Sequence, residues 1–432
     1  MAPTAAPLVL SPTDRVVQLV RTASREVTLA QVGLAVIAVH VLDDNFLQPQ
    51  PGTSASDHLV SGLVPVAVLL FAAATYHRLR GGLRGTIAIL LGALGVTMGA
   101  SEAVYYSLKV GPSGDDYTGF LALAAGLLLI GVGAATLWKT RRSDGSRAWR
   151  YVRRLLLTVG AVIAAYTLFL PFPAAYVFTH VGRAVVAEAN LGAAHEDVAF
   201  RTSDGLLLRG WYVPSKNGAA VIAFPGRTGP QRHTRMLVRH GYGVLLFDRR
   251  GEGQSDGDPN AFGWAMDKDL KAAAAFLQRR PDVDRDRIGG IGLSVGGEMM
   301  LQTAAETDAI KAVVSEGAGE RSIREVVENG TWAEVPSQFL LTVGTALFSN
   351  HLPPANLKDL APRIAPRPVF FIYATRGTGG EELNPTFYAA AGQPKTLWQV
   401  PGSSHTGGVK ARPMEYERRV IGFFDRALAT NS

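Results

Sequence analysis

The sequence of 432 residues contains no cysteine, which excludes disulfides, a thiolate nucleophile and metal sites with cysteine ligands. Charged residues are also scarce: they make up 18% of the chain, against about 25% in an ordinary soluble domain. Hydrophobic residues make up 47%, and the mean hydropathy is +0.13. This balance indicates an apolar membrane part joined to a globular part. The chain also lacks the His-Glu-x-x-His spacing of a zinc site, and we expect neither a metal nor a cofactor.

Apolar residues are concentrated in the first half of the chain. Five runs stand out there: Val27–Leu42, Leu59–Tyr76, Leu83–Leu108, Phe120–Trp138 and Leu155–Phe178. A helix needs about 20 residues to cross the hydrocarbon core of a bilayer, and the last four runs meet this length. The first run is shorter and follows three arginines, which is also typical of a signal peptide. We predict an N-terminal segment over residues 1–26 and a bundle of about five transmembrane helices over 27–180.

The charges of the loops predict how this bundle is oriented, because cytoplasmic loops are rich in Lys and Arg. Arginines precede the first run, whereas the loop between the first two runs has no Lys or Arg. The loop between the last two runs, KTRRSDGSRAWRYVRR, has seven. We therefore expect a cytoplasmic N-terminus and an extracytoplasmic C-terminal domain at the cell membrane; one re-entrant run would reverse the second placement. The net charge of +7 follows from these loops and does not indicate nucleic-acid binding.

Several titratable residues lie near the ends of the first and third runs that this orientation places outside. They are His40, Asp43, Asp44 and Glu102, with Asp57 and His58 in the adjoining loop. Ionisable groups within a membrane often mark a proton or ion site, so a polar cluster is one interpretation. The interpretation we favour is that these residues are interfacial and contact water.

From Glu196 the pattern changes to short apolar runs that alternate with amphipathic stretches. This alternation predicts an α/β domain over residues 196–432, after a linker over 181–195, with a mostly parallel sheet covered by helices on both faces. A long connection over about 318–361 predicts a small helical lid. Its side chains Trp332, Phe339 and Phe348 are candidates for an acyl pocket, and the alternatives are contact with the membrane or packing on the sheet.

Residues 292–296 read GLSVG, with Ser294 at the centre between a predicted strand and a predicted helix. This is the arrangement of a nucleophile elbow, a sharp turn that exposes a serine hydroxyl at the carboxyl edge of a sheet. A serine nucleophile needs a base, and in this topology the order along the chain is serine, acid, histidine. His405 follows the last predicted strand and is the candidate base.

The acid is less well defined by the sequence, because no Asp follows the predicted strand PVFFIYA. Glu381 is the favoured candidate, and Glu382 and Glu316 are the alternatives, since a glutamate can also orient and stabilise the imidazole. For the oxyanion, we expect backbone N–H donors from Val295 and Arg227. The Arg227 side chain could bind an anionic substrate group or point to solvent.

These motifs resemble those of the α/β-hydrolase superfamily from about Glu196 to the end of the chain. The resemblance is carried by FPG, DRRGEGQSDG, GLSVGG and PGSSHTGG, and it is greatest toward the dienelactone-hydrolase-like and serine-aminopeptidase-like branch. It implies hydrolysis of esters or peptides without a cofactor. The acid motif usual in that branch is absent here.

The leading hypothesis is therefore a membrane-anchored serine hydrolase that is carboxylesterase-like and uses a Ser-His-Glu triad. The expected partners are a small ester or peptide substrate and the lipid bilayer. The alternatives are a peptidase or amidase of the same fold, a non-catalytic membrane-anchored binding module, and a transporter or channel with an accessory domain.

Overall fold

A computed structural model describes residues 12–104, 107–108, 111–112, 114, 116–140, 146–183, 186–377 and 379–429. The chain divides into two compact units. The helical unit comprises the chain up to Pro49 together with His58–Ala165. The C-terminal unit comprises Gln50–Asp57 and the chain from Tyr166 onward. A short segment between the first two apolar helices thus packs with the C-terminal unit, as does the end of the fifth.

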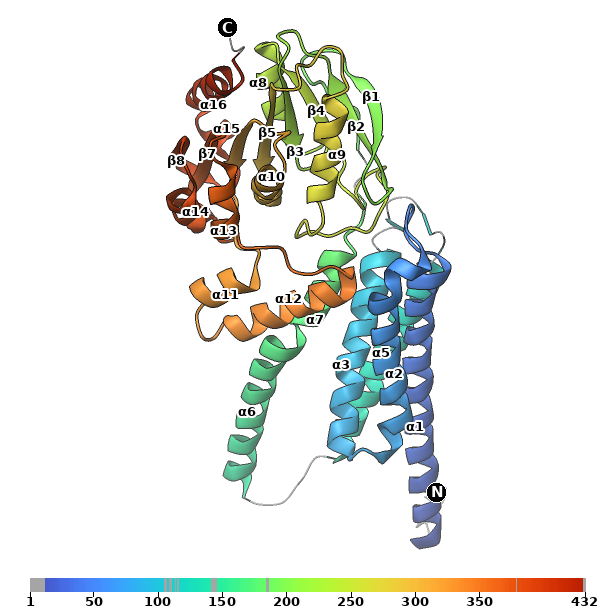
Figure 1. The fold of residues 1–432 in the computed structure, drawn as a ribbon. Helices are drawn as coiled ribbons and strands as arrows, with labels where there is room; N and C mark the ends of the chain where they lie inside the picture. The colour runs from blue at the N-terminus through green and yellow to red at the C-terminus, as the bar shows by residue number, and fades with distance from the viewer. Residues whose placement is uncertain are drawn as a thin grey trace, which may run out of the picture. The chain divides into compact units, whose positions relative to one another are not determined.

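The helical unit consists mainly of long apolar helices (Figure 1). Its elements are α1 (Pro12–Leu42), η1 (Asp43–Leu47), α2 (Leu59–Thr75), η3 (Tyr76–Arg78), α3 (Gly81–Gly99), η4 (Ala100–Val104), α5 (Asp116–Thr140) and α6 (Arg147–Ala164). Between η1 and α2, η2 (Ala55–His58) lies mostly in the C-terminal unit. The described residues contain five helices long and apolar enough to cross a membrane: Arg25–Leu47, Ala55–Arg78, Gly81–Gly99, Asp116–Thr140 and Ala148–Thr179. The prediction of five long apolar helices is confirmed.

Helices α3 and α5 pack through glycines that recur every seven residues. These are Gly85, Gly92 and Gly99 on α3 and Gly119, Gly126 and Gly133 on α5. A Cβ atom at Gly126 would lie 2.5 Å from the carbonyl oxygen of Gly92, and one at Gly92 would lie 2.7 Å from that of Gly126. The two backbones therefore approach at a distance that only glycine permits, as is common between membrane helices.

The polar residues at the C-terminal end of α1 are buried, so the expectation that they contact water is wrong for His40, Asp43 and Asp44. The hydroxyl of Thr118 on α5 donates to Asp43 (2.7 Å) and lies 3.2 Å from His40 Nδ1. The amide of Asn45 donates to Asp44 (3.0 Å). Hydrogen bonds within the unit thus hold Asp43, Asp44 and the Nδ1 side of His40 in place. The side chain of Glu102 lies outside the described residues, and no metal-binding group of His, Asp or Glu is present among the described ones.

The C-terminal unit is built on one eight-stranded sheet with the order β1-β2-β4-β3-β5-β6-β7-β8. The strands are β1 (Glu196–Arg201), β2 (Leu207–Val213), β3 (Ala220–Phe224), β4 (Gly243–Phe247), β5 (Ile288–Leu293), β6 (Ala312–Glu316), β7 (Val369–Arg376) and β8 (Lys395–Ser404). Strand β2 pairs antiparallel with both β1 and β4, and all pairs from β4 to β8 are parallel. This confirms the mostly parallel sheet.

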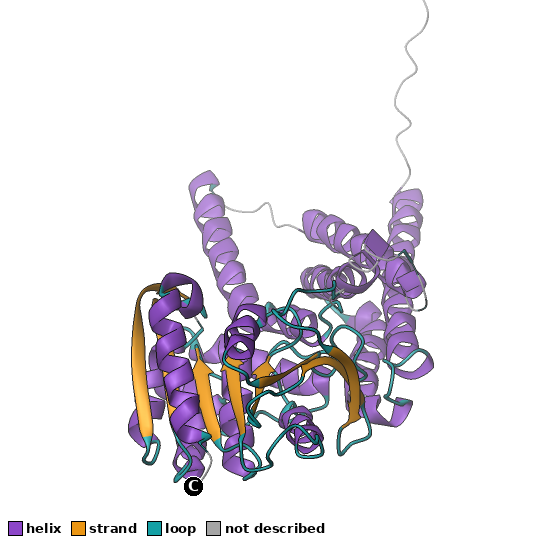
Figure 2. Ribbon diagram, turned by 90° about the horizontal axis from the view of Figure 1, so that it is seen from above, coloured by secondary structure: helices purple, strands orange, loops and turns teal. Residues whose placement is uncertain are grey.

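Helices cover both faces of the sheet (Figure 2). One core packs under α9 (Asp267–Leu277), α10 (Val295–Glu306), α13 (Leu357–Leu360), η6 (Ala361–Ile364) and α14 (Asn384–Ala390). The other packs under α8 (Gln231–Arg239) and α16 (Pro413–Ala427). The remaining elements are η5 (Ala165–Phe169), α7 (Pro171–Thr179), α11 (Ile323–Asn329), α12 (Val335–Ser349), η7 (Glu381–Leu383) and α15 (Gly408–Ala411). Helices α11 and α12 lie between β6 and β7, where the lid is predicted.

Candidate active site

Ser294 occupies a strained turn between β5 and α10. Its backbone has φ +54° and ψ −126°, a conformation that is rare for a residue with a side chain and typical of a nucleophile elbow. The flanking glycines make room for the turn. A Cβ atom at Gly292 would lie 2.1 Å from the carbonyl oxygen of Gly296, and one at Gly296 would lie 2.7 Å from that of Phe224. The G-x-S-x-G spacing is therefore a steric requirement of this turn.

Ser294, His405 and Glu381 form a continuous chain of hydrogen bonds. The Nε2 atom of His405 lies 2.8 Å from Ser294 Oγ, and Nδ1 lies 2.9 Å from Glu381 Oε2. Glu381 is fully buried, and its other oxygen accepts a hydrogen bond from the Ala374 N–H (2.7 Å). The hydrogen bond to Glu381 raises the pKa of His405, although burial acts in the opposite direction. The geometry suits a serine whose proton passes to a histidine held by a carboxylate.

The other two candidate acids point elsewhere. Glu382 is exposed on η7, next to the buried Glu381. Glu316, at the end of β6, is buried and accepts hydrogen bonds from Tyr416 Oη (2.6 Å) and the Gly408 N–H (2.8 Å). Its burial favours a raised pKa, but hydrogen bonding with His233 and these two donors outweighs it and lowers the pKa. Glu316 therefore fixes the segment after His405 and does not contact the imidazole itself.

The two expected oxyanion donors differ in their surroundings. Val295 is the first residue of α10, where a backbone N–H has no acceptor within the helix and lies at the positive end of the helix dipole. The Arg227 N–H donates to Asp248 Oδ1 at 3.3 Å. Val295 is thus the better placed donor, and Arg227 would have to exchange a long hydrogen bond for the oxyanion.

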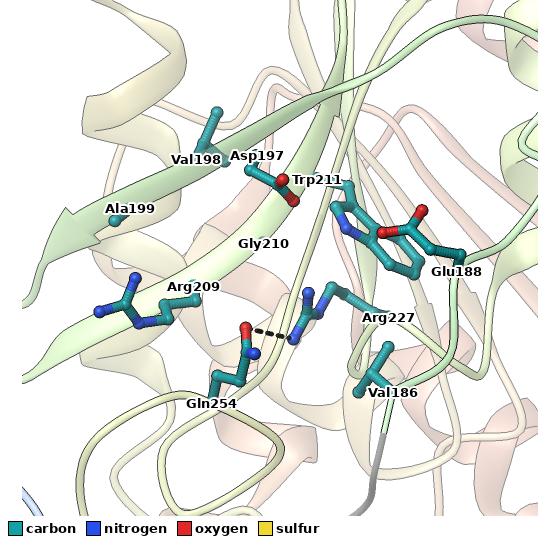
Figure 3. A pocket seen from close by; sticks show the side chains of 10 residues that line it. All are labelled: Val186, Glu188, Asp197, Val198, Ala199, Arg209, Gly210, Trp211, Arg227 and Gln254. Atoms are coloured by element: carbon teal, nitrogen blue, oxygen red, sulfur yellow. Dashed lines mark hydrogen bonds between the residues drawn. The ribbon is translucent and has the colours of Figure 1, made fainter.

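The Arg227 side chain is buried and does not line the cleft at Ser294, so the expectation that it points to solvent is wrong. Its guanidinium is buried, pairs with Asp248 Oδ2 (2.5 Å) and stacks at 4.9 Å over the Trp211 ring. Figure 3 shows it beside Trp211 and hydrogen-bonded to Gln254 in a cavity of about 340 Å³. None of the residues lining that cavity lines the cleft at Ser294. The sequence could not show this, because the pairing depends on an aspartate that follows a different strand, β4.

A cleft of about 590 Å³ opens onto Ser294 and His405. Its walls come from the start of α8, from the loop after β3 and from the turn after β8; among the lining residues are Thr228, Arg232, Arg235, Ser404 and Lys410. No acidic residue lines the cleft. A substrate can therefore approach the serine through a polar, positively charged opening.

The three lid candidates are not among the residues that line this cleft. Trp332 is 90% exposed and Phe339 is 44% exposed, whereas Phe348 is buried with its ring edge-on to Tyr176 at 5.5 Å. A role for these three residues in substrate binding stays a prediction. Phe348 packs on α7, and the other two side chains face outward.

Glu298 is a further neighbour of the site, and no motif in the sequence points to it. It lies one helical turn after Ser294 on α10, and its carboxylate accepts a hydrogen bond from the Gly319 N–H (3.1 Å). Burial raises the pKa of Glu298 to about 7, against the nearby charge of Arg321. Its position four residues after the nucleophile was the only signal for it in the sequence.

Comparisons with known proteins agree with this architecture. Residues 180–363, a range that includes Ser294 but ends before Glu381 and His405, match the family model of X-Pro dipeptidyl-peptidase (S15 family). The uncharacterized protein YfhR of Salmonella typhi is 26% identical over 299 residues, which cover 65% of this chain and 97% of YfhR. The polyketide transferase grgF of Penicillium sp is 35% identical over 127 residues, or 28% of this chain and 43% of grgF.

Solved structures give similar but more distant matches. The esterase Pf2001 of Pyrococcus furiosus is 23% identical with a TM-score of 0.47, over 58% of this chain and 100% of the esterase. The crystal structure of GrgF is 23% identical with a TM-score of 0.46, over 55% of this chain and 100% of GrgF. The superfamily prediction is confirmed, although the family model that matches is that of the S15 peptidases. From about residue 180 onward the chain is an α/β-hydrolase domain, preceded by five long apolar helices.

Proposed function

We propose that the protein is a membrane-anchored serine hydrolase in which Ser294, His405 and Glu381 form the catalytic triad. The observation that carries this proposal is the unbroken chain of hydrogen bonds from a strained, cleft-facing serine to a fully buried carboxylate. A binding module without catalysis has no need of this strain or of a buried glutamate held by a histidine.

The proposed reaction is acyl transfer in two halves. His405 Nε2 takes the proton of Ser294 as Oγ attacks the substrate carbonyl, and the negative oxygen that forms accepts a hydrogen bond from the Val295 N–H. Glu381 stabilises the resulting imidazolium. The imidazolium then gives its proton to the leaving group, which departs and leaves an acyl-enzyme. Water then attacks the acyl carbon while His405 takes its proton. The bond between the acyl carbon and Oγ breaks, the imidazolium returns the proton to Oγ, and the free acid leaves.

Carboxylic esters are the first substrate class we propose, and peptides are the second because the matching family model is one of X-Pro dipeptidyl peptidases. A panel of p-nitrophenyl esters and X-Pro p-nitroanilides distinguishes the two classes in the purified full chain. We expect ester hydrolysis that disappears in Ser294→Ala. Hydrolysis of X-Pro anilides alone would assign a peptidase, and hydrolysis that persists in Ser294→Ala would refute the triad.

The proposed location is the cell membrane, with the hydrolase domain on the extracytoplasmic side. The segment Gln50–Asp57, which follows the first apolar helix, packs on the hydrolase domain. The Gly257 N–H donates to the Pro51 carbonyl (2.8 Å), and Asn350 Nδ2 donates to the carbonyl of Asp57 (2.6 Å). The domain should therefore lie on the same side as this loop, which has no Lys or Arg and is expected outside.

Single cysteines test this orientation cleanly because the chain has none of its own. Ser56→Cys in the segment and Met414→Cys in the hydrolase domain both introduce an exposed thiol. Both should react with a membrane-impermeant maleimide in intact cells, whereas Ser146→Cys, between the fourth and fifth apolar helices, should react only after lysis. Reaction of Ser146→Cys alone in intact cells would reverse the orientation.

A further inference from the structure

Helix α12 presents an apolar stripe that the hydrolase unit leaves uncovered. Its 15 residues include no charged side chain. Pro336, Phe339, Leu340 and Val343 follow the i, i+3, i+4, i+7 spacing of a single helix face. Phe339 and Val343 are 44% and 39% exposed, and Trp332, in the turn before the helix, is 90% exposed. Apolar side chains gathered on an exposed face in this way mark an interaction surface.

The opposite face of α12 packs against α7, so the stripe has a fixed place in the unit (Figure 1). A Cβ atom at Gly344 would lie 2.8 Å from the Cβ of Ala175, which shows how closely the two helices approach. The rings of Phe348 and Tyr176 meet edge to face at 5.5 Å. The outward face of α12 is therefore held beside the last turns of the fifth apolar helix.

The length of that fifth helix indicates the depth of α12 relative to the hydrocarbon core of the bilayer. The segment Ala148–Thr179 has 32 residues, or about 48 Å of helix, whereas the hydrocarbon core is about 30 Å thick. Its last arginine is Arg154. About 20 residues counted from Leu155 reach the far side of the hydrocarbon near Ala174. Ala175, where α12 packs, then lies at the boundary between acyl chains and headgroups.

We propose that α12 is an interfacial helix that inserts Trp332, Phe339 and Val343 into the leaflet in which the fifth apolar helix ends. The inference rests on the proposed membrane anchoring and commits to lipid as the partner of this surface. The stripe is continuous with a helix of membrane-spanning length and offers no charge for a protein partner to recognise. A tryptophan beside an apolar helix face is also typical of the membrane–water interface.

The same helix reaches toward the active site on its other side. Leu341 and Thr345 line a small cavity of about 60 Å³ together with Phe262. The next residue of that loop, Gly263, packs on the catalytic turn, since a Cβ atom there would lie 2.5 Å from a side-chain carbon of Val295. One helix thus connects the lipid surface with the loop behind the proposed oxyanion donor. The substrates expected from this arrangement are amphiphilic esters held in the membrane.

A fluorescent label tests lipid contact without reference to activity. Phe339→Cys carries an environment-sensitive nitrobenzoxadiazole label, and the full chain is reconstituted in vesicles of phosphatidylcholine and phosphatidylglycerol. Met414→Cys is the matched control, because Met414 is an apolar side chain that is 85% exposed on α16. We expect blue-shifted emission at position 339 and several-fold stronger quenching by spin-labelled lipids than at position 414. Equal quenching at the two positions would overturn the proposal.

A second measurement links the surface to substrate supply. The triple variant Trp332→Ser, Phe339→Ser, Val343→Ser should lower hydrolysis of a long-chain ester in vesicles several-fold relative to hydrolysis of a short soluble ester. An unchanged ratio would contradict the role of α12 in supplying substrate. Lipid contact at position 339 in a protein that hydrolyses neither ester would leave the interfacial helix standing and refute the proposed function.

Discussion

The helical unit and the hydrolase unit both depend on glycine, but for different reasons. In the helical unit, glycines on α3 and α5 recur over the length of the helices and let the two backbones approach. In the hydrolase unit, large side chains fill a core on each face of the sheet, among them Phe224 and Phe371 on one face and Phe370 and Phe424 on the other. There the glycines that matter most for the site are Gly292 and Gly296, which flank the turn at Ser294.

This difference shows where each unit is vulnerable. Without a hydrophobic driving force between helices in lipid, association depends on close packing, and glycine supplies it over a long interface. In the hydrolase unit, burial of apolar surface supplies much of the stability, and Gly292 and Gly296 permit a local strain that serves the site. Changes in the bundle should therefore affect assembly, whereas changes at the turn should affect chemistry.

The largest effect is expected at the turn itself. Ser294→Ala should reduce turnover by about 10⁶-fold, if the loss known for another serine hydrolase applies. His405→Ala and the double variant should lose about as much, because the two groups act as one unit. Thermal unfolding should stay close to that of the parent chain. Steady-state kinetics on a p-nitrophenyl ester measure all three variants, and additive losses would show that the two residues do not act together.

The next largest loss of activity is expected when Glu381, but not the neighbouring Glu382, is replaced. Glu381→Gln keeps the size of a fully buried side chain but removes the charge that orients and stabilises the imidazolium, so kcat should fall by about 10⁴-fold. Glu382→Gln is the matched control, since its side chain is exposed. Kinetics of the two variants decide the acid, and a greater loss in Glu382→Gln would assign the role to that residue.

A smaller effect is expected from a side chain placed in the glycine interface of the bundle. A Cβ atom at Gly126 meets the backbone of α3, whereas one at Gly131 on the same helix meets nothing within 4 Å. Gly126→Leu should destabilise the unit by about 1–3 kcal/mol, the usual cost of overpacking, and Gly131→Leu should not. Thermal unfolding in detergent measures both, and hydrolysis of a soluble ester should persist in each. Equal stability would remove the contrast between the units.

The smallest effect is a shift in pH dependence. The hydrogen bond to Glu381 raises the pKa of His405 above its ordinary value of about 6.5. His405 must be neutral to accept the serine proton. We therefore expect kcat/KM to increase with pH along a titration curve whose midpoint lies above about 6.5. Removal of the charge in Glu381→Gln should move the midpoint to lower pH. A midpoint that stays in place would separate Glu381 from the titration of His405.

The hydrolase fold and two site residues could be predicted because local pattern determines them. The elbow requires a serine between glycines after a strand. A histidine in the loop after the last strand lies at the carboxyl edge of the same sheet. The choice between Glu381 and Glu382 could not be made this way. It depends on the turn at Gly379 and Gly380, both with positive φ, which leaves one glutamate buried and the next exposed.

Other features depend on partners that are distant in the sequence. Arg227 is held by Asp248, 21 residues away, and His40 and Asp43 are hydrogen-bonded to Thr118, more than 70 residues away. The glycine interface was visible as a seven-residue spacing in two apolar runs, but apolar content alone does not show which runs meet. The orientation of the α12 stripe likewise follows from its packing on α7.

The central claim is that Ser294 is the nucleophile of this protein. Labelling of the full chain with a fluorophosphonate probe, followed by mass spectrometry of the modified peptide, tests it most directly. The probe should modify Ser294 alone, labelling should be lost in Ser294→Ala, and it should persist in Ser404→Ala, which removes another hydroxyl from the same cleft. A folded chain that takes up no probe, or takes it up at a different residue, would contradict the account.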